Sequence, residues 1–251
     1  MVYEGDELRN VLEIHKLWVE SDHLCGERAL FQHGDVIRSH KDIFLPYAMM
    51  KGVIVIGTMS GANLEGAILN DADLSTLDFS DANLQGASLI RANMEFSDFC
   101  DADFKNASIS RANIYGAKFE FAQNLPYIPM VCPDTGSFIG WKKCYIDDDT
   151  GIERGFCLSP VIVKLRIPWN AKRSSATSRK CRASRAIVVE IQGLDGEVLP
   201  NDTVAYSGYD SSFEYKVGCS VKPRGQFDTN RWIECSEGIH FFMNREEAVD
   251  Y

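Results

Sequence analysis

Residues 62–76 read ANLEG-AILND-ADLST, and the same five-residue pattern returns as ANLQG at 82–86 and ADFKN at 102–106. A period of five fits neither the 3.6-residue turn of an α-helix nor the two-residue alternation of a β-strand. A large apolar residue occupies twelve consecutive centres, and a small residue stands two positions before each centre except at Leu77. The centres are Leu64, Leu69, Leu74, Phe79, Leu84, Leu89, Met94, Phe99, Phe104, Ile109, Ile114 and Phe119.

This pattern resembles the pentapeptide-repeat family, in which five residues form one side of a square coil and four sides complete a turn. The resemblance implies a right-handed quadrilateral β-helix over residues 52–125. One coil cannot bury its own interior, so coils must stack, with strand-like hydrogen bonds at a spacing of about 4.8 Å. A disordered segment rich in Ala, Asn and Asp would not keep an apolar residue at every fifth place.

Residues twenty apart share one face if four pentapeptides complete a turn. The register therefore predicts a core ladder of Phe79, Phe99 and Phe119 above Met59, and a second inward row that begins at Ile54. Outside the phenylalanine face it predicts an acidic stripe, which is a candidate surface for a partner. The stripe consists of Asp78, Asp81, Asp98 and Asp101.

Residues 1–51 are expected to form an N-terminal cap. Apolar residues recur at helical spacing between Asp6 and Ser21, which predicts an amphipathic helix over the open end of the coil. The stretches 27–31 and 34–36 look like degenerate repeats of a first coil. Residues 39–48 break the register, and we expect a loop there before Ile54 resumes it.

Residues 126–251 lose the period and predict a separate α+β domain that is mostly β. β-rich or alternating runs cover 137–141, 161–167, 186–191, 213–217 and 238–243, and a short helix is expected after Asn244. The whole chain is therefore assigned to the mainly β class. Its three predicted parts are 1–51, 52–125 and 126–251.

The highest density of functional side chains in this last part is in a basic run at 172–185, where Arg and Lys alternate with Ser and Thr hydroxyls. Arginine forks and hydroxyls bind phosphate, so the run is a candidate phosphate or nucleotide site. The alternatives are a solvated connection between two strands and a segment that docks on the acidic repeat. The candidate ligands are Lys172, Arg173, Ser175, Thr177, Ser178, Arg179, Lys180 and Arg182.

Other reactive residues give weaker patterns. His240 with Glu234 or Glu237 suggests acid–base chemistry, but a histidine inside an apolar strand is more often a core residue with its hydrogen bonds satisfied. The eight cysteines show no C-x-x-C pair, so neither a disulfide framework nor a zinc site is indicated. We expect no metal, no cofactor and no catalytic residues, and Cys132, Cys181 and Cys235 are assigned structural roles.

The net charge of −10 is uneven: residues 52–124 carry ten acids and four bases, whereas residues 125–251 carry 17 and 16. This balance argues against direct binding to nucleic acid. No run is apolar enough for a membrane span, and the first residues do not resemble a signal peptide. We therefore expect a cytoplasmic protein that does not bind membranes.

Three stretches, 138–143, 171–182 and 238–242, resemble a class of phage and bacterial pentapeptide-repeat proteins with an uncharacterised C-terminal domain. That resemblance implies no known reaction. Our first hypothesis is a non-enzymatic protein-interaction module, encoded by a phage and acting on a host protein in the host cytoplasm. Its oligomeric state is left open.

Two alternatives remain at this stage. The C-terminal domain could bind or sequester a nucleotide or another phosphate ligand. The repeat could also act as a DNA mimic, because quinolone-resistance proteins with the same repeat imitate duplex DNA on topoisomerases through stacked acidic side chains. Those proteins are longer rods and usually dimers, whereas this chain has fewer than four regular coils.

Overall fold

The structure, a computed structural model, describes residues 1–147 and 158–251. The chain divides into two compact units, Met1–Ile128 and Pro129–Tyr251, which are described separately. The five-residue repeat lies in the first unit. Neither of the two described helices has the length and apolar character that crossing a membrane requires.

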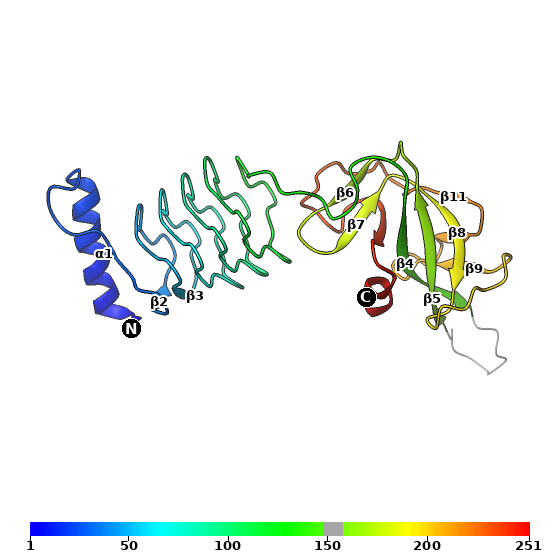
Figure 1. The fold of residues 1–251 in the computed structure, drawn as a ribbon, viewed down its shortest axis with the longest axis horizontal. Coiled ribbons are helices and arrows are strands. Elements are labelled where there is room, and N and C mark those ends of the chain that lie inside the picture. The colour runs from blue at the N-terminus through cyan, green and yellow to red at the C-terminus, as the bar shows by residue number, and fades with distance from the viewer. Residues whose placement is uncertain (148–157) are drawn as a thin grey trace. The chain divides into compact units, whose positions relative to one another are not determined.

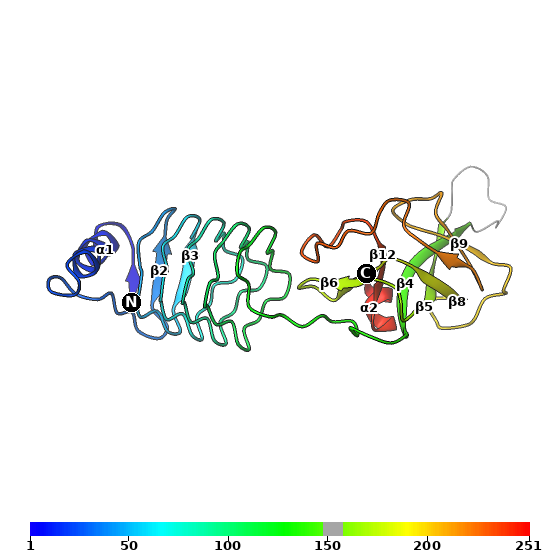
Figure 2. The same cartoon turned by 90° about the horizontal axis from the view of Figure 1, so that it is seen from above.

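The repeat folds into stacked coils, which Figure 1 shows from one side and Figure 2 after a quarter turn. Backbone bridges join residues twenty apart in parallel, as in Asn63 with Asn83 and Asp78 with Asp98. Around one bridge, Leu64 N donates to the Asn83 carbonyl at 2.8 Å, and Asn83 N donates to the Ala62 carbonyl at 2.9 Å. Each coil therefore supplies the hydrogen-bond partners of the next, and the repeat forms a mainly β solenoid, a β-helix. The predicted right-handed sense stays a prediction.

The corners of the coil are tight turns whose third residue has a positive φ. After Leu64, Ala67 N donates to the Leu64 carbonyl at 3.0 Å, and Gly66 between them has φ +60°. Glycine, Asn and Asp adopt this backbone readily, whereas other residues do so at a cost. Thr76 and Phe96 nevertheless occupy corners, with φ +60° and +56°. The five-residue period thus repeats a backbone conformation as well as an apolar side chain.

Asn and Asp residues just before the centres accept hydrogen bonds from the backbone N–H two residues later. The Oδ1 of Asn63 accepts from Glu65 N at 3.2 Å, and the Oδ1 of Asp98 accepts from Cys100 N at 3.0 Å. Such side chains locally replace a backbone acceptor. The same contact is made by Asp73, Asp78, Asn83, Asn93, Asp103 and Asn113.

The phenylalanine ladder lies in the solenoid interior, where all three rings are fully buried. The rings of Phe79 and Phe99 stack with centroids 4.8 Å apart, and those of Phe99 and Phe119 at 5.3 Å. Phe104 packs against Phe99 and Phe119 at tilted angles. The ring spacing follows the spacing of the coils.

The loop predicted at residues 39–48 is wrong, because these residues belong to a regular coil. Bridges join Phe44 to Asn63, Met49 to Ile68 and Ile54 to Asp73, all nineteen residues apart. Val55 is 6% exposed and points inward, whereas Ile54, predicted as an inward residue, is 40% exposed. The side of the coil between Val55 and Met59 is one residue short, which shifts the register of everything before it.

The chain before this coil forms a partial coil and a helix. β1 (Val2–Tyr3) pairs in parallel with β2 (Val36–Ser39), which pairs with β3 (Ile54–Gly57). α1 (Gly5–Glu20) lies beside the first coil in both views. The fully buried His15 of α1 joins them: its Nε2 is 2.8 Å from the Pro46 carbonyl, and Ala29 N donates to its Nδ1 at 3.1 Å. This pattern requires the neutral imidazole, and burial lowers the pKa of His15.

The second unit is built on an antiparallel sheet of nine described strands, in the order β11-β8-β5-β4-β12-β7-β6, with β9 pairing β4 and β10. All five β-rich runs of the prediction contribute a strand, but the basic run forms a hairpin, β6–β7, instead of a plain connection. The helix expected after Asn244 is α2 (Arg245–Asp250), with an Asn244–Glu247 capping box. The strands are β4 (Phe138–Asp147), β5 (Leu158–Ile167), β6 (Arg173–Ser175), β7 (Lys180–Ala183), β8 (Ala186–Gln192), β9 (Val204–Tyr206), β10 (Glu214–Lys216), β11 (Ser220–Val221) and β12 (Ile239–Phe242).

One face of this sheet carries the main core of the unit. Gly140 of β4 lies under the ring of Phe241 from β12, and a Cβ at Gly140 would come within 2.4 Å of that ring. The central buried side chains come from neighbouring strands and pack into one apolar cluster. They include Cys144, Val161, Val163, Leu165, Cys181, Val188, Ile191 and Phe241.

Candidate interaction surfaces of the solenoid and the basic hairpin

The four residues of the predicted acidic stripe have different roles. Asp78 and Asp98 each accept a backbone N–H in their own turn, and Lys118 Nζ contacts the Asp98 carboxylate at 3.2 Å. The hydrogen bonds and the Lys118 charge hold the pKa of Asp98 below its usual value although burial opposes this. Asp81 and Asp101 occupy exposed corners with φ of +60° and +61°. Half of the stripe therefore hydrogen-bonds within the coil, and the other half lies at exposed corners.

Asp42 extends the exposed half of the stripe. It also occupies a corner, with φ +57°, and its carboxylate lies over Gly61, the corner residue of the next coil. The corner row therefore runs Asp42, Gly61, Asp81, Asp101 and Phe121. We call Asp42, Asp81 and Asp101 the acidic corner. Asp42 was missed because the nineteen-residue coil places it in a register that the twenty-residue count does not reach.

The acidic corner differs from the other carboxylates of the repeat in having no internal partner. Among the described residues, no hydrogen bond or ion pair reaches the side chains of Asp42, Asp81 or Asp101, whereas Asp71 pairs with Arg91 at 2.6 Å. The remaining carboxylates of residues 52–124 all make contacts as well. These are Glu65, Asp73, Asp78, Glu95, Asp98, Asp103 and Glu120.

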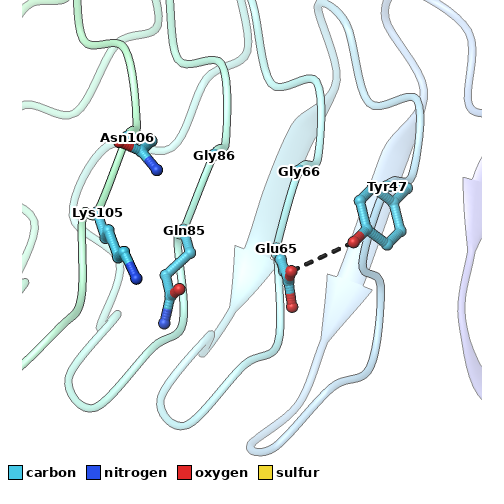
Figure 3. Close-up of a pocket in the computed structure, with 7 residues that line it drawn as sticks. All are labelled: Tyr47, Glu65, Gly66, Gln85, Gly86, Lys105 and Asn106. Carbon is cyan, nitrogen blue, oxygen red and sulfur yellow. Dashed lines mark hydrogen bonds between the residues drawn. The ribbon is translucent and has the colours of Figure 1, made fainter.

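A groove of about 340 Å³ follows another corner of the solenoid (Figure 3). Its floor is Gly66 and Gly86, two consecutive corners without side chains, and the Tyr47 hydroxyl donates to Glu65 at 3.2 Å at one end. The Tyr47 ring covers Gly66, because a Cβ there would come within 2.5 Å of the ring. Its polar side chains are Glu65, Gln85, Lys105 and Asn106, which do not form a catalytic constellation.

Two arginines of the basic hairpin, Arg173 and Arg182, bind backbone carbonyls of their own unit. Arg173 makes five hydrogen bonds to five backbone carbonyls, those of Ala171, Pro133, Gly136, Pro168 and Trp169. A guanidinium has five N–H donors, so none is left for a phosphate. Its charged plane also lies over the Phe138 ring at 5.2 Å. The structure therefore does not support Arg173 as a phosphate ligand.

Arg182 is 2% exposed, and its guanidinium also binds backbone carbonyls. It donates to the carbonyls of Asp228 and Glu237 at 3.2 Å and of Asn230 at 2.7 Å, and it stacks on Phe227. Burial lowers the pKa of this guanidinium. The structure therefore does not support Arg182 as a phosphate ligand either, because the side chain fastens the loop before β12 to β7.

The other predicted phosphate ligands also have contacts within the unit. Ser175 is 2% exposed and accepts from Val131 N at 2.8 Å, while Ser178 donates to Glu234 at 2.7 Å. Arg179 pairs with Glu247 at 2.6 Å, and Lys180 bonds to the Tyr251 hydroxyl at 2.9 Å. Thr177 also has an interaction partner, and the Lys172 side chain is exposed. The run is thus largely a structural hairpin.

His240, the possible acid–base residue of the same unit, contacts the backbone. Its Nε2 is 3.0 Å from the Glu234 carbonyl, so the neutral ring donates to backbone and not to a carboxylate. Burial, together with the charges of Lys180 and Lys142, lowers the pKa of His240 to about 4. Lys142, on the core face of β4, also has a pKa lowered by burial. Among the described residues, no group of three or more His, Cys, Asp or Glu is placed to hold a metal ion.

The comparisons with known proteins divide the chain in the same way. The pentapeptide-repeat family (eight copies) matches residues 59–95 and 82–120, and the family of unknown function DUF5758 matches residues 128–248. Two uncharacterised proteins of Acanthamoeba polyphaga mimivirus are similar. L223 is 39% identical, and the match covers 36% of this chain and 61% of L223. L227 is 27% identical, and the match covers 45% of this chain and 76% of L227. The chain thus spans less than two thirds of L223, and both relatives come from a virus of amoebae, not from a phage.

Solved structures resemble parts of the chain only. A pentapeptide repeat protein from the Arabidopsis thaliana thylakoid lumen is 29% identical and covers 40% of this chain and 66% of its own, with a TM-score of 0.26. QnrB1, a plasmid-mediated fluoroquinolone resistance protein, is 19% identical, and the match covers 38% of this chain and 55% of QnrB1, with a TM-score of 0.31. The chain therefore joins pentapeptide repeats to a C-terminal region, residues 128–248, that matches the DUF5758 family of unknown function.

Proposed function

We propose that this chain is a protein-binding module and that the acidic corner of its solenoid contacts the partner. The observation that carries the proposal is that Asp42, Asp81 and Asp101 have no partner among the described residues, whereas the other carboxylates of the repeat stabilise the coil. An exposed charge without an internal partner contributes little to folding. It remains available to bind an opposite charge.

The shape of the corner favours a basic protein segment as its partner. Consecutive coils set Asp81 and Asp101 about 4.8 Å apart along the solenoid, a spacing that suits Arg or Lys side chains. Phe121 continues the row and is 69% exposed, which offers an apolar contact beside the charges. Since the coil backbone is already ordered, binding loses little conformational entropy at this surface.

Several finer points belong to the same proposal. We infer that α1 and β1 cap the N-terminal edge, because an open edge would expose unpaired backbone groups. The right-handed sense is retained, since crossovers between parallel strands are overwhelmingly right-handed. As viruses encode both relatives, we infer that the partner is a protein of the infected cell and that binding takes place in its cytoplasm. No catalysis is proposed.

The density of charge weighs against DNA mimicry. Duplex DNA presents one phosphate charge per about 1.7 Å of axis, whereas the acidic corner presents at most one carboxylate per coil of about 4.8 Å. In the neighbouring row, the charge of Asp98 is compensated by Lys118. A basic protein segment therefore matches this surface better than a DNA-binding protein would.

The test compares two variants that lose the same charge. Asp42→Asn, Asp81→Asn and Asp101→Asn together neutralise the acidic corner, and Asn tolerates positive φ as Asp does. Glu65→Gln, Glu95→Gln and Glu120→Gln together form the matched control. A protein captured by the tagged wild type from infected-cell lysate is purified and titrated with all three forms over a range of salt concentrations.

We expect the corner variant to bind at least about tenfold more weakly, roughly 1.4 kcal/mol, and to show a smaller salt dependence. The control should bind as the wild type does, apart from a modest long-range effect. Equal affinities for the two variants would show that the acidic corner is not the contact surface.

A further inference from the structure

Aromatic rings from the coil before cover two corner glycines of the solenoid. A Cβ at Gly66 would come within 2.5 Å of the Tyr47 ring. A Cβ at Gly116 would come within 2.4 Å of the Phe96 ring. Each ring therefore occupies the space that the missing side chain of the glycine leaves. Side chains also lie over two further glycines, His33 over Gly52 and Asp42 over Gly61.

Gly86 is a corner glycine without such a cover. It is exposed, its φ is +66°, and the corner before it is Gly66, which has no side chain to place there. The nearest atoms to a Cβ at Gly86 would be backbone atoms of Gly66 at 3.9 Å. The groove of about 340 Å³ lies over this position (Figure 3). This volume is at the lower end for ligand pockets and suits a single side chain.

The covering rings also contact the residue just before the glycine that they cover. The Tyr47 hydroxyl donates to Glu65 Oε1 at 3.2 Å. The Phe96 ring packs edge-on against Tyr115, with centroids 5.4 Å apart. A ring on a corner glycine of this solenoid is thus held by two contacts, one with the glycine and one with the residue before it.

Gln85 and Lys105 supply polar groups beside the uncovered glycine. Gln85 is the residue before Gly86, and its Nε2 donates to Asp103 Oδ2 at 2.8 Å. In this orientation the Gln85 Oε1 is an acceptor that no donor of the described residues reaches. The exposed Lys105, one coil further, lines the same groove, and its ammonium makes no hydrogen bond or ion pair among those residues (Figure 3).

We propose that the Gly86 corner binds the side chain of a tyrosine from a partner protein. The bound ring lies on Gly86 as the Tyr47 ring lies on Gly66, and its hydroxyl donates to the Gln85 Oε1. The coil spacing of about 4.8 Å places it beside the Tyr47 ring, at a separation where aromatic pairs attract each other. The Lys105 ammonium can approach the ring face, which adds a cation–π contact.

Other side chains match this site less well. Phenylalanine covers the glycine but leaves the Gln85 acceptor without a donor, and leucine offers no planar face to Tyr47. The charge of Lys105 opposes an arginine, which the acidic corner by contrast attracts. The Gly86 corner belongs to a different corner row from the acidic corner. The inference therefore adds a second contact with a protein and does not depend on the first.

The test titrates the full chain with N-acetyl-tyrosinamide, a neutral probe, and follows the backbone amide signals by NMR. We expect saturable shifts centred on Gln85, Gly86 and Lys105. N-acetyl-phenylalaninamide should bind about two- to tenfold more weakly, the factor that one hydrogen bond contributes. N-acetyl-leucinamide and N-acetyl-argininamide should bind more weakly still.

Three variants locate the site, and circular dichroism checks that each is folded. Gly86→Asn places a side chain on the corner and accepts its backbone, as Asn106 does with φ +59°. It should weaken binding of the tyrosine probe by about two- to tenfold, the factor of one aromatic contact. Asp81→Asn, at another corner of the same coil, is the matched control and should bind as the wild type does. Gln85→Met removes the acceptor and should abolish the preference for the tyrosine probe over the phenylalanine probe.

Saturable binding at Gly86 with this order of probes supports the proposal. The proposal would be overturned by the absence of saturable shifts up to the solubility limit of the probe, or by equal binding to Gly86→Asn and the wild type. Equal or tighter binding of the phenylalanine or arginine probe would overturn the assignment to tyrosine. Because the probe is neutral and no partner protein is present, these outcomes are independent of whether the acidic corner binds its partner.

Discussion

The rings of Phe79 and Phe99 lie 4.8 Å apart and within 12° of parallel, on consecutive coils of the solenoid. Phe99 also stacks on Phe119 and is fully buried, so it contacts rings above and below. Phe99→Ala should therefore leave a cavity in the middle of the ladder and lower the free energy of unfolding by about 3–5 kcal/mol. Urea unfolding followed by circular dichroism measures this change.

Phe121→Ala is the control for the loss of a phenyl ring on the same face of the coil. Phe121 is 69% exposed, and surface changes of this kind alter stability by about 0.5 kcal/mol or less. Similar losses for the two variants would show that the ladder does not hold the solenoid together.

Thr76 occupies a corner where its backbone is unfavourable. Its φ is +60°, and a β-branched residue rarely adopts this conformation. Thr76→Asn keeps a polar side chain and accepts the backbone, so it should raise the free energy of unfolding by about 1 kcal/mol. Thr135→Asn, at an exposed position without a positive φ, controls for the change of residue type. A loss of stability in Thr76→Asn would mean that the corner is not strained.

The parts of the fold that the sequence predicts are those where one rule repeats. The ladder and corner rows follow from a count of five, because each pentapeptide meets the same neighbours one coil away. The prediction fails at Val55–Met59, where a single missing residue changes the count and moves Asp42 onto the acidic corner. The hydrogen-bond partners of Arg173 and Arg182 depend on tertiary structure, and no local pattern encodes them.

Arg173 provides a direct contrast between the phosphate-site and structural interpretations. Its five hydrogen bonds go to carbonyls, and Lys has only three donors without the planar fork. Arg173→Lys should thus lower the free energy of unfolding by about 1–3 kcal/mol, since Lys can keep at most three of the five hydrogen bonds. Lys172→Ala, next to it but exposed, should have little effect. A phosphate site would give the opposite pattern: a stable Arg173→Lys protein that has lost binding of a labelled nucleotide.

His240 should make the protein sensitive to mild acid. Its pKa is lowered to about 4 in the folded protein and is about 6.5 when the chain is unfolded. Below pH 6.5 the unfolded state binds a proton that the folded state does not, so stability falls as the pH drops from 6.5 towards 4. By this linkage His240 alone should cost about 2 kcal/mol between pH 7 and pH 4.5.

The measurement is the urea midpoint of the wild type and of His240→Gln at several pH values. Gln keeps an N–H donor for the Glu234 carbonyl but does not titrate, so the difference between the two proteins isolates the histidine from the carboxylates that also titrate in acid. His40→Gln controls for the loss of an exposed histidine. His15, whose pKa burial also lowers, should add to the acid sensitivity that remains in His240→Gln. Parallel pH profiles for wild type and His240→Gln would mean that His240 accepts a proton in the folded protein as easily as in the unfolded chain, and that its hydrogen bond to Glu234 does not keep it neutral.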